Sequence, residues 1–117
     1  MRVKSAIFVS ALLRRSRVEG AYALVRRRGA EEAGAIFVLV DWLDGRVSLY
    51  GPAPQSATDD YDRAFSPLHA ADAIPAAEAE IILTRELRFD SDLWIVVVED
   101  RDGRHFLDRI VPRSAAR

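Results

Sequence analysis

The sequence contains no cysteine. Disulfide frameworks, thiolate zinc sites, iron–sulfur clusters and cysteine nucleophiles are therefore excluded, and the chain suits a reducing compartment. Long apolar runs are absent too, because even a run such as Ala35 to Val40, which no other run exceeds, is far shorter than the roughly 20 residues that a membrane helix needs. Lysine is scarce, with Lys4 alone among 17 basic residues. We expect a cytoplasmic protein that does not cross a membrane.

The residues that are present predict a folded chain. Half of the 117 residues are hydrophobic and 30% are charged, which is typical of one globular domain over residues 1–117. We expect a long loop at residues 52–72 and a frayed tail at residues 113–117. The net charge is −1, but residues 1–58 are basic on balance and residues 59–117 are acidic on balance. The two halves could neutralise each other, or the basic half could meet phosphate.

The first elements are predicted from periodicity. Residues 5–14 alternate with period two, which predicts a strand. The apolar spacing of Val18, Ala21, Tyr22 and Val25 predicts a helix that ends at Gly29. The run Ala35–Val40 predicts a strand buried on both faces, since nothing polar interrupts it.

The remaining elements follow from turns and apolar runs. Asp44-Gly45 predicts a hairpin into a strand at Val47–Tyr50, and the loop that follows leaves room for a short edge strand near residues 61–66. A second helix is predicted from Pro75 to about Arg88. Leu93–Val98 predicts a second buried strand, and Asp102-Gly103 predicts a hairpin into a strand at His105–Val111.

Together these elements predict an α+β fold, with a mainly antiparallel sheet of about five to six strands and two helices packed on one face. The halves also resemble each other at an offset of 58, since Val38, Asp44 and Gly45 fall on Val96, Asp102 and Gly103. This offset suggests a strand-helix-strand-strand unit used twice. The common steric rules of Asp-Gly hairpins explain the same likeness without a repeat.

The carboxylates at the end of the second helix are the strongest candidates for chemistry. Glu86 and Asp90 lie four residues apart, Asp92 follows, and Glu86 falls inside the apolar arc of the predicted helix. Such a group, with His105, could serve a metal-assisted or acid–base enzyme. The ordinary alternative is an arginine partner for the buried charge, with four residues available: Arg14, Arg15, Arg85 and Arg88.

Two other charged groups are weaker candidates. The N-terminal arginines could bind phosphate or nucleic acid, and they comprise Arg14, Arg15, Arg17, Arg26, Arg27 and Arg28. In the predicted helix, however, Arg26–Arg28 also suit the negative end of the helix dipole. Asp59, Asp60 and Asp62 could hold a divalent ion, although solvated acidic loops are far commoner. No motif predicts a cofactor, and we expect no metal site.

Five segments in combination resemble a known family: SALLRR at 10–15, AGAIFV at 33–38, LYGPAP at 49–54, FDSDLW at 89–94 and EDRDGRHFL at 99–107. The chain is similar, over about residues 5–107, to the bacterial family catalogued as domain of unknown function 1491. The resemblance implies a small bacterial cytoplasmic protein of that family. It implies no activity, because the family has no assigned activity and none of these segments is catalytic.

Three hypotheses follow for the function. The leading one is a non-catalytic protein-interaction or regulatory module that self-associates through a sheet edge or an exposed aromatic such as Trp42 or Trp94. The second is the enzyme built on Glu86, Asp90, Asp92 and His105. The third is a weak phosphate or nucleic-acid binder that uses the N-terminal arginines.

Overall fold

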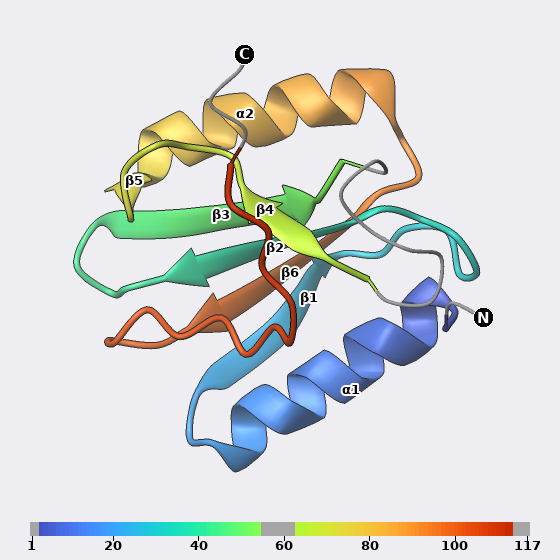
Figure 1. Ribbon diagram of the computed structural model, residues 1–117, viewed down its shortest axis with the longest axis horizontal. Helices are drawn as coiled ribbons and strands as arrows, with labels where there is room; N and C mark the ends of the chain where they lie inside the picture. The colour runs from blue at the N-terminus through green and yellow to red at the C-terminus, as the bar shows by residue number, and fades with distance from the viewer. Residues whose placement is uncertain (1–2, 55–62, 114–117) are drawn as a thin grey trace.

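The computed structural model describes residues 3–54 and 63–113. The described residues form two helices and six strands (Figure 1), in the order α1 (Ser5–Val18), β1 (Tyr22–Arg27), β2 (Ile36–Asp41), β3 (Arg46–Pro52), β4 (Phe65–Pro67), β5 (Ile74–Pro75), α2 (Ala76–Phe89) and β6 (Trp94–Glu99). All strands belong to one sheet with the order β1-β6-β2-β3-β4, while the short β5 pairs with β3.

The sheet confirms the predicted α+β class and its mainly antiparallel character. Every strand pair is antiparallel except β2 with β6, which is parallel. The two apolar runs lie side by side in the interior of the sheet, as their composition predicts. Ile36 stands opposite Trp94 and Asp41 opposite Glu99, so residues 58 apart in the sequence are neighbours in this ladder.

The two faces of the sheet carry separate cores, because successive side chains of a strand point to opposite faces. Val38 and Val96 pack with Val9 and Leu12 of α1. The alternate positions of the same strands pack with Ala79 and Leu83 of α2. The helices therefore cover opposite faces of the sheet, with α1 and α2 on either side in Figure 1. The prediction that both pack on one face is wrong, since strands as apolar as β2 and β6 need cover on both faces.

The N-terminal region also differs from its prediction. Residues 5–14 lie in helix α1 and not in a strand, and the buried stripe of this helix consists of Ser5, Val9, Leu12 and Ser16. Two serines in that stripe hide its helical spacing, and a nearly continuous apolar run fits either period. Each serine is satisfied inside the core: Ser5 donates to the carbonyl of Gly34 at 2.6 Å and Ser16 to that of Leu12 at 2.8 Å.

The predicted helix that starts at Val18 is strand β1 instead. Helix α1 ends at Val18, and Gly20 follows with a φ of +91° and donates its N–H to the carbonyl of Arg17. A glycine in this conformation ends a helix, so the signal assigned to Gly29 belongs to Gly20. β1 then pairs with β6, with a bulge between Val25 and Arg27.

The C-terminal prediction is half confirmed. The turn at Asp102-Gly103 forms, with Gly103 at a φ of +70°. It leads into an irregular segment and not into a strand at His105–Val111, and the one bridge of this segment joins Ile110 to Phe65 in parallel. The segment covers part of the sheet face that α1 leaves open, as Phe106, Leu107 and Ile110 join the core on that face.

The remaining predictions meet mixed outcomes. Helix α2 and strand β3 lie close to their predicted ranges, and β4 overlaps the short edge strand expected near residues 61–66. The repeated strand-helix-strand-strand unit is not observed, because the first half runs α1-β1-β2-β3 and the second β4-β5-α2-β6. The likeness at offset 58 reduces to the parallel pair of β2 and β6 and the glycine turns that follow them, where Gly45 and Gly103 both have positive φ.

Candidate functional site

The two tryptophans do not form an exposed aromatic surface. Trp94 is 1% exposed, and its indole N–H donates to the carbonyl of Ala30 at 2.8 Å, so the prediction of Trp94 as a docking residue is wrong. Trp42 is half-buried, with the guanidinium of Arg46 over its ring at 4.8 Å. Its other neighbour is Gly103, where a side chain would collide with the indole. Trp42 is thus a structural anchor between the two glycine turns.

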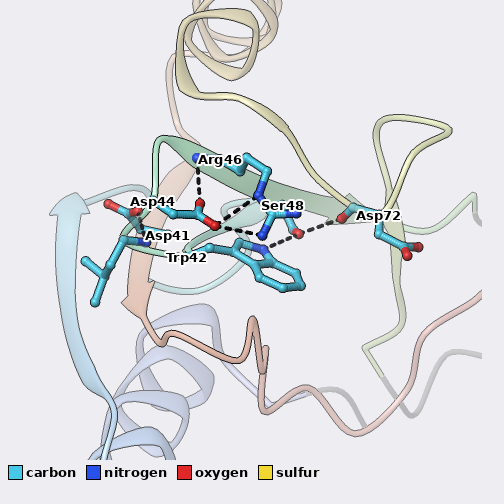
Figure 2. A network of polar contacts seen from close by, with 7 residues as sticks. Asp41, Trp42, Asp44, Arg46, Ser48 and Asp72 are labelled. Atoms are coloured by element: carbon cyan, nitrogen blue, oxygen red, sulfur yellow. Dashed lines mark hydrogen bonds and ion pairs between the residues drawn. The ribbon is translucent and has the colours of Figure 1, made fainter.

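A polar network surrounds Trp42 at the β2–β3 turn (Figure 2). The indole N–H donates to the hydroxyl of Ser48 at 2.9 Å, and that hydroxyl donates to the backbone carbonyl of Asp72 at 2.7 Å. Asp44 accepts two hydrogen bonds from the guanidinium of Arg46, which lowers the pKa of the Asp44 carboxyl. The network ties the turn to the loop before β5, and its donors and acceptors satisfy one another.

A hollow of about 390 Å³ adjoins this network, and its lining consists of Tyr50, Pro67, His69, Ala70, Ala71, Asp72 and Arg113. His69 in its wall has both ring nitrogens occupied, because Nε2 accepts from the N–H of Leu49 at 2.8 Å and Nδ1 lies 2.6 Å from the carbonyl of Ala71. An imidazole held in this way fixes the loop and has no free nitrogen for catalysis.

The second histidine lies on the same face of the sheet as Tyr50. The rings of His105 and Tyr50 meet edge to face at 5.2 Å, and Nδ1 of His105 accepts from the N–H of Leu107 at 2.8 Å. Burial lowers the pKa of His105 and raises the pKa of Tyr50, because both charged forms lose water. Both groups are therefore neutral near pH 7.

The predicted carboxylate group is not brought together with His105. Glu86 lies on α2, on the opposite face of the sheet from Tyr50 and His105. Asp90 follows the helix and uses Oδ1 to accept the N–H of Asp92 at 2.9 Å, which is a local turn bond. No arginine pairs with Glu86, Asp90 or Asp92 among residues 3–54 and 63–113, so the expected neutralising partner is not seen there either.

The predicted arginine cluster is dispersed over both faces of the sheet. Arg15 and Arg17 of α1 donate to the carbonyls of Phe106 and Ala23 at 2.9 and 2.8 Å. On β1, Arg26 makes a two-bond ion pair with Glu80 of α2, and this pair raises the pKa of Arg26 and lowers that of Glu80. The others also differ in their surroundings: Arg14 is exposed, Arg27 donates to the carbonyl of Leu93, and Arg28 lies over the Trp94 ring.

Two further predictions concern metals and membranes. Asp59, Asp60 and Asp62 lie outside the described residues. In the part of the chain that the structure describes, no three His, Asp or Glu side chains converge in a way that could hold a metal ion. Neither α1 nor α2 is long and apolar enough to cross a bilayer.

Among the described residues, the outward face of α2 stands out for its exposed apolar side chains; this face is defined here as Ala77, Glu78, Ile81, Thr84, Arg85, Arg88 and Phe89. Phe89 is 85% exposed and Ile81 is 60% exposed, although both are large apolar side chains. A shallow hollow of about 350 Å³ runs along the helix here, lined by residues that include Ile81, Thr84 and Arg88. The sequence carries a signal for this face, since Ile81 falls opposite Ala79 and Leu83 on a helical wheel.

Solved structures of other proteins share this fold. The structure is similar to a solved protein of A. tumefaciens, with a TM-score of 0.81 and 45% identity over 99% of this chain and 100% of that one. It is also similar to the crystal structure of a DUF1491 family protein from Caulobacter crescentus, with a TM-score of 0.78 and 34% identity over 97% of this chain and 100% of that one. No curated protein matches the chain. The family model described as "Protein of unknown function (DUF1491)" matches residues 3–108, and the chain therefore belongs to the DUF1491 family.

Proposed function

We propose that the chain is one globular domain that works as a non-catalytic protein-interaction or regulatory module, and that its contact surface is the outward face of α2. The observation that carries this proposal is the exposure of Phe89 and Ile81. Large apolar side chains grouped on one face and rimmed by charge are typical of protein-binding surfaces. Arg85 contributes to that rim.

The other surfaces considered from the sequence are less suited to binding. Trp94 is buried, and the half-buried Trp42 is held in place by its own contacts. The edge strand β1 is interrupted by a bulge and carries Arg26 and Arg27, features that hinder the addition of another strand. These facts favour α2 over the sheet edge.

The placement of the candidate catalytic groups supports the same choice. Both ring nitrogens of His69 make hydrogen bonds to backbone groups, and His105 lies on the opposite side of the sheet from Glu86. An acid–base pair needs its members within hydrogen-bond reach of a shared substrate. We therefore favour an interaction role over the metal-assisted or acid–base enzyme.

Site-specific photocrosslinking in the source organism tests the proposal. A photoreactive residue at position 81 is expected to give discrete protein adducts, and the added substitution Phe89→Asp is expected to remove them. The control is the same photoreactive residue at position 43, because Leu43 is also exposed but lies in the β2–β3 turn. Adducts that are equal at both positions, or absent at position 81, would overturn the proposed surface.

A further inference from the structure

We propose that the outward face of α2 binds the same face of a second copy of this chain, with the two helices antiparallel about a two-fold axis. This inference rests on the proposed function, since it names the occupant of that surface. It follows from the distribution of size and charge along the helix.

The centre of the face has the spacing of a helix-pairing seam. Ala77, Ile81, Thr84 and Arg88 are separated by four, three and four residues, which places them along one side of the helix. All four are exposed. If the two-fold axis passes between Ile81 and Thr84, an antiparallel partner brings Ile81 of each copy against Thr84 of the other. The same row of residues then forms both sides of the interface.

Side-chain size is complementary about the same centre. The first turn of α2 presents the small residue Ala77 on this face, and the last turn presents Phe89. Reversal of one helix brings each Phe89 to about the level of Ala77 of the other copy. The aromatic ring then covers a surface that has room for it, and its apolar area leaves water.

Charge is complementary as well. Glu78 lies in the first turn and Arg85 lies seven residues later on the same flank, with Arg88 in the last turn. None of the three has an ion-pair partner among residues 3–54 and 63–113. With a rise of about 1.5 Å per residue, the reversed helix brings Glu78 of one copy to the level of Arg85 and Arg88 of the other. The two-fold axis makes this contact twice.

Helix α1 offers an instructive contrast. Its outer side also has exposed apolar residues, Ile7 and Val18, but the charges between them are Arg14 and Arg17. A second copy of α1 would meet like charges, which destabilise such pairs. Self-complementarity is thus a property of α2 and not of exposed helices in this chain generally.

The expected dimer is weak. We expect contact between two 14-residue helices to bury less than the roughly 800 Å² per partner of a standard stable interface. Because the ion pairs lie at the surface, added salt should weaken the association further. Sedimentation velocity from micromolar to millimolar concentration, at low and at high salt, measures both effects.

Exchange of the charges at positions 78 and 85 distinguishes self-association from the binding of any other protein. Glu78→Arg and Arg85→Glu each place like charges across the two-fold axis, and each is expected to weaken self-association about tenfold. An equimolar mixture of the two variants restores both opposite-charge contacts, and so does the double variant. Circular dichroism confirms that each variant is folded, which is expected because both side chains are exposed.

The outcomes distinguish the two proposals. Restored association in the mixture supports the antiparallel pair. A wild-type chain that stays monomeric at millimolar concentration, or a mixture no stronger than the single variants, overturns it. If position 81 still gives specific adducts whose mass contains a different protein, the interaction role stands and only the second copy is rejected. If position 81 gives no adducts, the proposed function fails by itself.

Discussion

The opposite faces of α2 can be tested with two substitutions that are close in sequence. Leu83 is 1% exposed and belongs to the core between α2 and the sheet, while Ile81 points to solvent. Leu83→Ala removes three buried carbon atoms at about 0.8 kcal/mol each and leaves a partly open cavity. We expect the free energy of unfolding to fall by about 3 kcal/mol. Ile81→Ala should change it by less than about 0.5 kcal/mol, because the side chain is already in water.

Urea unfolding followed by circular dichroism measures both values. A loss of about 3 kcal/mol corresponds to a decrease in Tm of about 12 °C for a chain of this length. The Ile81 variant is the matched control, since it measures the effect of helix propensity and of a shorter side chain at a position outside the core. Equal losses for the two variants would refute the reasoning, as they would mean that α2 does not present Leu83 to the sheet and Ile81 to solvent.

Three further predictions concern the turn at Gly103 and its surroundings. Gly103→Ala should destabilise the protein clearly more than Gly45→Ala, since both positions have positive φ but only the first collides with the Trp42 indole; thermal unfolding of the two variants compares them. Asp100→Asn should lower the free energy of unfolding at pH 7 by about 1 kcal/mol, because Asp100 accepts three hydrogen bonds from Arg104, and urea titration measures this loss. Burial lowers the pKa of His105, so its NMR titration midpoint should lie below the ordinary 6.5.

The two acid–base predictions have a defined pH dependence. The Arg104 guanidinium lowers the pKa of Asp100 below its ordinary 3.8, so the stabilisation is present above that pH and is lost as the pH falls through the lowered pKa. Burial of neutral His105 likewise stabilises the protein above about pH 6.5 and less so below it, since the unfolded chain takes up the proton first. A midpoint above 6.5 for His105, or an Asp100 variant as stable as wild type at pH 7, would contradict these assignments. Equal losses for the two glycine variants would contradict the contact with Trp42.

The strongest sequence signals were local runs long enough to allow one interpretation. The continuous apolar segments at β2 and β6 predict buried strands because no polar residue gives either face to water, and Pro75 with the stripe Ala79 and Leu83 predicts α2. The secondary-structure prediction for the first 28 residues is wrong for the opposite reason. Their apolar residues fit two periods, and the serines that complete the α1 stripe are polar, so hydrophobic periodicity missed them.

For the candidate site, too, one feature could be predicted from the sequence and the others could not. The exposure of Ile81 follows from the helical wheel, but the dispersal of the carboxylates, arginines and histidines does not, because it depends on which face of the sheet each element covers. Glu86 and His105 are 19 positions apart in the chain and are separated by the sheet itself. Sequence distance carries no information about that separation.

By itself, the sequence determined the α+β class, the two interior strands, the hairpin after β2 and the helix α2, since each rests on the pattern of neighbouring residues. Only the tertiary structure decided that β2 and β6 run parallel, that α1 and α2 lie on opposite faces, and that Trp94 is buried. The physical reason is burial: an apolar strand needs cover on both faces, and which distant segment supplies it depends on the packing of the whole chain.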